Sequence, residues 1–173
     1  NTDIWTREGA YGSASAPNAI AAWKGVPLDF PRIQGIDAAG IVDAVGHGVD
    51  SAWIGRRVLV DPTVTYDGED PIDIIGSEAD GAFAQFHVCV EQRLHDVSDS
   101  PLTDAQISCL PTAYGTGMGL INRADCRAGE RVIVTGSSGG VGSAAIELLA
   151  GRGCHVIART SAAKVDAVLG FGA

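Results

Sequence analysis

Apolar and polar positions alternate over short stretches in the first part of the chain. The alternation is loose over residues 35–46 and clean over residues 83–90, and the short apolar run in residues 57–60 ends at an Asp-Pro turn signal. Alternation with a period of two residues is typical of strands with one buried face. Residues 63–82 are acidic and rich in turn residues, which predicts an exposed loop. Up to about Val97, the pattern therefore predicts a mainly β unit.

Helical spacing replaces the alternation from residue 100 onward. Ser100 or Thr103 can cap a first helix, because Asp104 and Gln106 would then lie in its first turn. Pro111 interrupts this pattern. The elements expected after it are a helix over 114–124, a strand over 131–136, a helix over 143–152, a strand over 154–160 and the start of a helix over 161–173. The alternation of strands and helices is typical of a parallel α/β unit.

The segment between the first of these strands and its helix, VTGSSGGVGS at residues 134–143, is rich in glycine. A loop that leaves a strand and opens a helix presents backbone N–H groups and the positive end of the helix dipole to a ligand. Glycines let a ligand approach the backbone closely. The spacing of Gly136, Gly139 and Gly142 is close to the dinucleotide fingerprint GxGxxG, whereas the lysine of a triphosphate-binding loop is missing. The loop therefore predicts a pyrophosphate site, with a purely structural turn as the alternative.

The residues after the second strand indicate which dinucleotide binds. An NAD site usually carries an acidic residue there, which bonds the ribose 2′-hydroxyl. Arg159 stands at this place, followed by Thr160, Ser161 and Lys164. Two cations and two hydroxyls suit a 2′-phosphate, which predicts NADP(H) as the cofactor. The alternative is an ordinary helix start with Ser161 as its cap and Lys164 in solvent.

Composition and charge narrow the classes of function. Of the 173 residues, 46% are hydrophobic and 19% are charged, as in a globular protein. The formal net charge of −9 argues against binding to nucleic acid or to an anionic membrane surface, and no apolar run is long enough to span a bilayer. The four cysteines are far apart, so we expect reduced thiols in a cytoplasmic protein and no metal site. They are Cys89, Cys109, Cys126 and Cys154.

Four groups of residues, in this order along the chain, resemble the medium-chain dehydrogenase/reductase superfamily. They are 35–60 (the GroES-like catalytic domain), 81–97 (its GxFAEY strand), 111–120 (the helix that lines the cleft between domains) and 134–142 with 158–164 (the cofactor domain). The implied fold is α/β, with a GroES-like mainly β domain over 1–99 and a Rossmann-type doubly wound parallel sheet over 100–173. Because two strands are fewer than such a sheet needs, and the chain starts without a methionine, we expect an internal part of a longer protein.

The residues at the superfamily's metal positions differ from those of its zinc enzymes. Ile36 stands where those enzymes carry a metal-binding histidine, and Asp37 replaces a glutamate. Ser108 stands at the position of a ligand cysteine, and its neighbour Cys109 would point about 100° away along a helix. The loop that would hold a structural zinc has no cysteine. Since isoleucine cannot bind zinc, the chain resembles the zinc-free, NADPH-using quinone oxidoreductase-like branch.

This resemblance implies an NADPH-dependent oxidoreductase that transfers hydride to an activated carbonyl, an enone or a quinone without zinc. It places Thr2 at a proton-relaying position and Tyr11 in the cleft as a candidate donor. The alternatives are a cofactor contact or helix cap for Thr2 and simple packing for Tyr11.

The expected state is a homodimer that acts on a small-molecule substrate. Two other functions stay open, a non-catalytic NADPH-binding module or subunit and a zinc-dependent alcohol dehydrogenase with altered ligands. The expected cofactor-binding residues are Thr112, Gly136, Ser137, Ser138, Gly139, Gly140, Val141, Gly142, Arg159, Thr160, Ser161 and Lys164.

Overall fold

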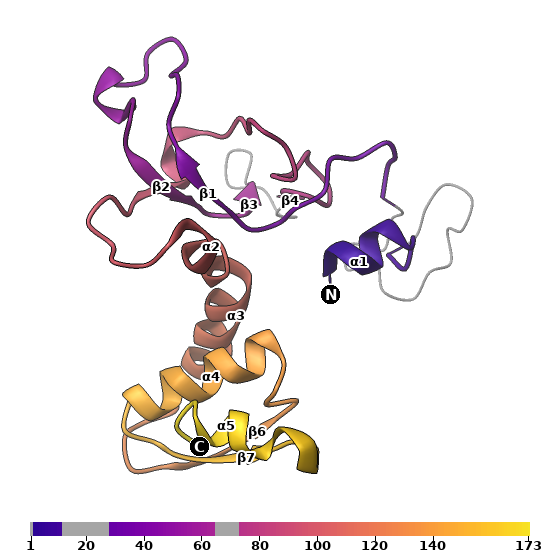
Figure 1. Ribbon diagram of the computed structural model, residues 1–173, viewed down its shortest axis with the longest axis vertical. Coiled ribbons are helices and arrows are strands. Elements are labelled where there is room, and N and C mark those ends of the chain that lie inside the picture. Colours follow the sequence, from indigo (N-terminus) through magenta and orange to yellow (C-terminus); the bar gives the residue numbers. More distant parts are fainter. Residues whose placement is uncertain (1, 12–27, 65–72) are drawn as a thin grey trace. The chain divides into compact units, whose positions relative to one another are not determined.

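The computed structural model describes residues 2–11, 28–64 and 73–173 of the chain. Contacts within the chain divide it into two compact units, Asn1–Ser108 and Cys109–Ala173 (Figure 1). The first is built mainly on strands, and the second combines helices with a parallel pair of strands. The domain boundary between residues 99 and 100 stays a prediction.

Short antiparallel strands form the framework of the first unit. Its elements are the helix α1 (Thr2–Arg7), the strands β1 (Ala38–Ile41), β2 (Arg57–Val60), β3 (Thr63–Val64), β4 (Asp73–Ile74) and β5 (Leu94–Asp96), the 3-10 helices η1 (Ser51–Trp53) and η2 (Glu91–Arg93), and the helix α2 (Asp104–Ile107). The larger sheet has the order β1-β2-β5, with Ala38 opposite Val60 and Val58 opposite Asp96. β3 and β4 form a second antiparallel pair.

The strand β2 follows directly from its sequence pattern. Val58 and Val60 are buried, at 4% and 7% exposure, so one face of the strand belongs to the core. The guanidinium of Arg57 donates to the carboxylate of Asp104, the first residue of α2, at 2.5 Å, and to two backbone carbonyl oxygens of the segment before that helix. This side chain therefore ties α2 to the sheet. The predicted strand at residues 57–60 is confirmed.

The predicted start of α2 at Thr103 is also confirmed. The Thr103 hydroxyl accepts from the backbone N–H of Gln106 at 3.3 Å, and the Gln106 side chain accepts from the backbone N–H of Thr103 at 2.9 Å. The two bonds form a capping box, which satisfies donors that a helix start otherwise leaves unpaired.

Two other expectations for the first unit need correction. The strand expected within residues 35–46 is shorter, Ala38–Ile41. The stretch 63–82, expected to be an exposed loop, contributes β3 and β4, because Thr63 pairs with Ile74 and Val64 with Asp73. The middle of that stretch, residues 65–72, lies outside the described residues.

The prediction of a strand at residues 83–90 is wrong. The segment is not part of any described sheet, and its apolar side chains face outward, with Phe86 at 66% and Val88 at 93% exposure. His87 and Cys89 lie on the less exposed side, and burial raises the pKa of the Cys89 thiol. The alternation is real, but its apolar positions are the exposed ones.

Three glycines meet where segments of the first unit cross, Gly35, Gly76 and Gly81. A Cβ on Gly81 would lie 2.4 Å from the carbonyl oxygen of Gly35 and 2.6 Å from the Cα of Gly76. A Cβ on Gly76 would lie 2.8 Å from the backbone nitrogen of Gly35. Backbone bonds fix the crossing, from the N–H of Gly81 to the oxygen of Ile33 at 2.7 Å and from the N–H of Ala82 to the oxygen of Gly35 at 2.9 Å. No side chain fits between these backbones.

The second unit is a β–α–β unit with a long helix packed on it. Its elements are α3 (Leu110–Arg123), β6 (Arg131–Thr135), α4 (Gly140–Gly151), β7 (His155–Arg159), the 3-10 helix η3 (Ala162–Lys164) and α5 (Val165–Leu169). β6 and β7 pair in parallel, and their last pair is Thr135 opposite Arg159. The predicted parallel α/β unit is therefore confirmed.

Both long helices of this unit begin earlier than the sequence pattern predicts. α4 begins at Gly140 rather than at residue 143. α3 begins at Leu110 and carries Pro111 in its first turn, so the proline opens this helix and does not interrupt it. Proline is tolerated there because the first N–H groups of a helix have no intrahelical acceptor.

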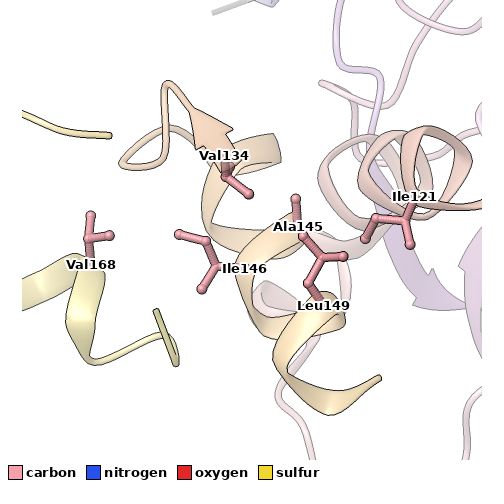
Figure 2. Close-up of a cluster of buried hydrophobic side chains, with 6 residues drawn as sticks. All are labelled: Ile121, Val134, Ala145, Ile146, Leu149 and Val168. Carbon is pink, nitrogen blue, oxygen red and sulfur yellow. The ribbon is translucent and has the colours of Figure 1, made fainter. Parts of the chain in front are cut away.

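A cluster of buried apolar side chains holds the second unit together (Figure 2). Ile146 of α4 is fully buried at its centre. The cluster consists of Ile121, Val134, Ala145, Ile146, Leu149 and Val168. α3 approaches α4 closely, since a Cβ on Gly117 would lie 3.4 Å from the backbone nitrogen of Ala145. This packing fixes α4, and with it the loop between β6 and α4.

Only one face of the β6–β7 pair is buried, whereas the sequence pattern predicts a buried strand at β6. Val134 of β6 faces the cluster, at 9% exposure. Ile133 and Ile157, which pair across the two strands, are 69% and 51% exposed. The described residues therefore cover this small sheet on the α4 side.

Candidate functional site

The loop between β6 and α4 has the geometry of an anion site. Gly136 turns the chain in the left-handed region, with φ of 62°, and its oxygen accepts from the N–H of Gly139 at 3.0 Å. Gly139 occupies the N-cap position and offers no side chain to the first turn of α4. No side chain caps the first N–H groups of α4, which leaves them available to an anion.

Gly142 lets the helix begin directly on the loop. A Cβ at this position would lie 2.3 Å from the carbonyl oxygen of Gly136 and 2.7 Å from the Cα of Ser137. A Cβ on Gly136 would meet nothing within 4 Å. The loop is thus crowded on the side of the helix and open on the other, which fits a loop that receives a dinucleotide pyrophosphate.

The two serines of the loop have different surroundings. Ser137 is fully buried, and its hydroxyl donates to the carbonyl oxygen of Arg159 at 2.8 Å. Ser138 is exposed, and its Oγ lies 3.4 Å from the Nζ of Lys164. Ser137 therefore offers a ligand no exposed surface, whereas Ser138 offers its side chain.

The structure brings the predicted 2′-phosphate residues to the same edge of the sheet as the loop. Arg159 is the last residue of β7, is exposed, and forms no ion pair with any residue in the described ranges. The Oγ of Thr160 is buried without a hydrogen-bond partner among those residues. Ser161 stands at the N-cap of η3, but its side chain makes no capping bond. The capping role considered for Ser161 is therefore absent from the structure.

The start of α3 lies beside the same loop. A Cβ on Gly140 would lie 3.7 Å from the Cβ of Ala113, the residue after Thr112. Thr112 is half-buried in the first turn of α3. Two residues further, the hydroxyl of Tyr114 donates to the carboxylate of Glu147 on α4, and this bond raises the pKa of Tyr114. The pair joins the two helices at the surface, a contact that the sequence pattern does not indicate.

The candidate catalytic residues lie at the other end of the chain, in the first unit. Thr2 opens α1, and the next residue, Asp3, anchors that helix beside Ile36. The Asp3 carboxylate accepts from the backbone N–H of Gly35 at 3.0 Å. The ring of Tyr11 packs at 6.2 Å from that of Trp5, so packing is the contact that the structure shows for it.

The metal position of the zinc enzymes is apolar here. Ile36 is 8% exposed and belongs to the core of the first unit. Within the described ranges, no three His, Cys, Asp or Glu side chains gather at a spacing that could hold a metal ion. None of the four cysteines forms a disulfide. Absence of zinc stays a prediction, because it concerns the whole protein.

Comparison with known proteins decides the family. The model of the alcohol dehydrogenase GroES-like domain matches residues 1–99. The chain belongs to this family. With it, the chain belongs to the medium-chain dehydrogenase/reductase superfamily, which confirms the predicted superfamily and fold class. The GroES-like match covers the first unit's strands, and the parallel β6–β7 unit is the start of a Rossmann-type sheet.

The relatives of this GroES-like chain include reductases and dehydrogenases. A solved structure of a proposed alcohol dehydrogenase from Sinorhizobium meliloti 1021 is 44% identical, with a TM-score of 0.87, over 100% of this chain and 49% of its own. The crotonyl-CoA carboxylase/reductase of Cereibacter sphaeroides is 36% identical over 90% of this chain and 41% of its own. The quinone oxidoreductase of Rattus norvegicus is 31% identical over 74% of this chain and 34% of its own.

The chain spans only part of every one of these relatives. It covers about half of the solved structure and 5% of a mycocerosic acid synthase-like polyketide synthase of Mycobacterium tuberculosis, which it also matches. No helix within the described residues has the length and apolar character that a membrane span needs.

Proposed function

We propose that the chain forms part of an NADPH-dependent oxidoreductase that transfers hydride to an activated carbonyl, an enone or a quinone without catalytic zinc. In this proposal residues 1–99 are the GroES-like catalytic domain and residues 100–173 begin the cofactor domain. The protein would act on a small molecule as a homodimer in the cytoplasm, and light scattering of the full-length protein tests the dimer. Relatives named as a quinone oxidoreductase and a crotonyl-CoA carboxylase/reductase support the choice of activated acceptors.

The observation that supports NADPH as the cofactor is that two cationic side chains, those of Arg159 and Lys164, lie at the edge of the glycine loop. Lys164 reaches the exposed Ser138, and Arg159 ends the neighbouring strand without an ion pair among the described residues. A 2′-phosphate would bring a negative charge to this edge, and guanidinium and ammonium groups bind phosphate well. A carboxylate suited to the 2′-hydroxyl of NADH is missing from residues 159–164.

A zinc-free mechanism is proposed from the apolar character of the metal position. The buried Ile36 offers no ligand atom, so this position cannot help to polarise a carbonyl through zinc. A bound nicotinamide supplies the hydride. The protein must then donate a proton or hydrogen bond to the developing oxyanion. We assign this task to the hydroxyl of Thr2 or Tyr11, as the two candidates of the first unit.

Titration of the full-length protein with NADPH and with NADH, followed by nicotinamide fluorescence, tests the cofactor part. Arg159→Asp should weaken NADPH binding by about 10–100-fold, since a hydrogen bond to a charged group contributes about 1.5–3 kcal/mol. NADH binding should change little. Arg131→Asp is the matched control, because Arg131 is exposed at the opposite end of the same two strands. Equal affinity of the unmodified protein for both dinucleotides would refute the assignment of NADPH.

Oxidation of NADPH by 9,10-phenanthrenequinone or by an enone tests the reaction. Activity should survive chelators, and metal analysis should find no stoichiometric zinc. Tyr11→Phe and Thr2→Val remove the two candidate hydroxyls one at a time, and the variant that lowers turnover while NADPH binding persists identifies the donor. Bound zinc would favour the zinc dehydrogenase, and NADPH binding without turnover of any acceptor would favour the non-catalytic module.

A further inference from the structure

The hydroxyl of Ser137 makes a buried connection between the two halves of the candidate cofactor site. Its side chain is completely shielded from solvent, although the residues on either side of it, Gly136 and Ser138, are exposed. The Oγ donates to the carbonyl oxygen of Arg159 at 2.8 Å. The loop that would receive the pyrophosphate is thereby bonded to the residue expected at the 2′-phosphate.

This bond lies beyond the end of the β6–β7 ladder. The last strand pair is Thr135 opposite Arg159, after which one chain turns into the glycine loop and the other into η3. Two side-chain hydrogen bonds join these diverging segments, that of Ser137 and the surface contact of Lys164 with Ser138 at 3.4 Å. The Ser137 bond is the shorter and is protected from water, so it sets the position of the Arg159 peptide group.

We propose that Ser137 is a positioning residue for coenzyme choice. Its hydroxyl fixes the peptide group of Arg159 so that the guanidinium and the following residues stay at the distance from the glycine loop that separates a 2′-phosphate from the pyrophosphate. Ser137 acts through Arg159, because its buried side chain cannot touch the dinucleotide. This inference rests on the proposed NADPH-binding function.

Loss of the hydroxyl should weaken NADPH more than NADH. Ser137→Ala leaves the carbonyl oxygen of Arg159 without its partner and lets the strand end move. A single hydrogen bond of this kind is worth a change of roughly threefold to tenfold in an equilibrium constant. We expect the ratio of the NADH to the NADPH dissociation constant to fall by that factor. NADH does not use the 2′-phosphate contacts, so its own affinity should hold.

The experiment measures both dissociation constants of the full-length protein by nicotinamide fluorescence, together with its unfolding temperature without ligand. Ser143→Ala is the matched control. The Ser143 hydroxyl lies in the first turn of α4, just after the loop that holds Ser137, and also bonds backbone oxygens, those of Gly139 and Gly140 at 3.0 Å, but it does not reach β7. Ser137→Cys keeps a weaker donor of similar shape and serves where the alanine variant fails to fold. It should lower the ratio in the same direction.

The outcomes separate the inference from the proposed function. A ratio that falls in the Ser137 variants and holds in the Ser143 variant supports the inference, whatever the unfolding temperature does. An unchanged ratio with a lower unfolding temperature, or equal weakening of both dinucleotides, means a merely structural serine and overturns it. The proposed function would survive that result, provided that the unmodified protein prefers NADPH and Arg159→Asp abolishes the preference. An unmodified protein without a preference for NADPH defeats the proposed function and the inference together.

Discussion

Replacement of Gly142 by alanine is the most direct test of the loop geometry. The added Cβ would lie 2.3 Å from the oxygen of Gly136, 2.7 Å from the Cα of Ser137 and 2.9 Å from the carbonyl carbon of Gly136. All three are backbone atoms, so no flexible side chain can move aside. Either the first turn of α4 or the loop must shift as a whole.

The size of the effect follows from two opposing contributions. Overpacking lowers the stability of a folded region by roughly 1–3 kcal/mol, and the close contacts with backbone atoms place the loss for Gly142→Ala near 3 kcal/mol. The alanine also stabilises the helix by about 1 kcal/mol, because it is a better helix former than glycine. The net loss is about 2 kcal/mol, which is roughly a 30-fold change in the opening equilibrium of the β6–α4 region.

Amide hydrogen exchange of the full-length protein measures this change in the peptides that contain β6 and α4. Gly119→Ala is the control, because it lies inside α3 and its Cβ would meet nothing within 4 Å. Gly119→Ala should slow exchange within α3 only, by the gain in helix propensity of about 0.5–1 kcal/mol. A Gly142→Ala protein that exchanges as slowly as the unmodified one, and binds NADPH as well, would refute the reasoning.

Three further substitutions test other parts of the structure. Hydrogen bonds from Ser98 lower the pKa of Asp96 to about 2, below its ordinary value of 3.8. The stability that Asp96 contributes is therefore present above pH 3.8 and is lost as the pH falls toward 2, so Asp96→Asn should flatten acid unfolding in this range, followed by circular dichroism. Thr103→Ala removes the capping box with Gln106 and should lower the free energy of urea unfolding by about 1 kcal/mol. Ile146→Ala opens a cavity in the cluster of the second unit, and exchange in α4 should show a loss of about 2–5 kcal/mol, whereas a loss below 1 kcal/mol would mean that the site collapses.

The second unit could be predicted from the sequence because its signals are local. An apolar strand, a glycine loop and an apolar helix follow one another without a break, and each carries its own pattern. The positions of Arg159 and Lys164 at the loop followed from the parallel order of the strands. The bond from Ser137 to Arg159 could not be predicted, because it joins residues 22 positions apart and depends on the inward rotation of one side chain. The candidate roles of Thr2 and Tyr11 stay predictions.

The first unit was harder to predict because its strands are defined by distant partners. β2 pairs with β5, more than thirty residues further along the chain, and nothing in the local pattern of either strand identifies the other as its partner. At residues 83–90 the alternation was visible, but it could not tell which side faces inward. Phe86 is exposed and His87 has its Nε2 buried, the reverse of what side-chain polarity predicts. Alternation gives the period of an extended segment, and only the neighbouring segments decide its face.

The crossing of Gly35, Gly76 and Gly81 restricts how this sequence can change over time. A crowded position in a protein core can usually be rescued by a second mutation that shortens the neighbouring side chain. Here the three atoms nearest to a Cβ on Gly76 or on Gly81 all belong to the backbone, among them atoms of another glycine. A substitution cannot shorten the backbone, so a second mutation to a smaller side chain would not relieve the clash at either position. Divergence in this part of the fold must proceed around these two glycines.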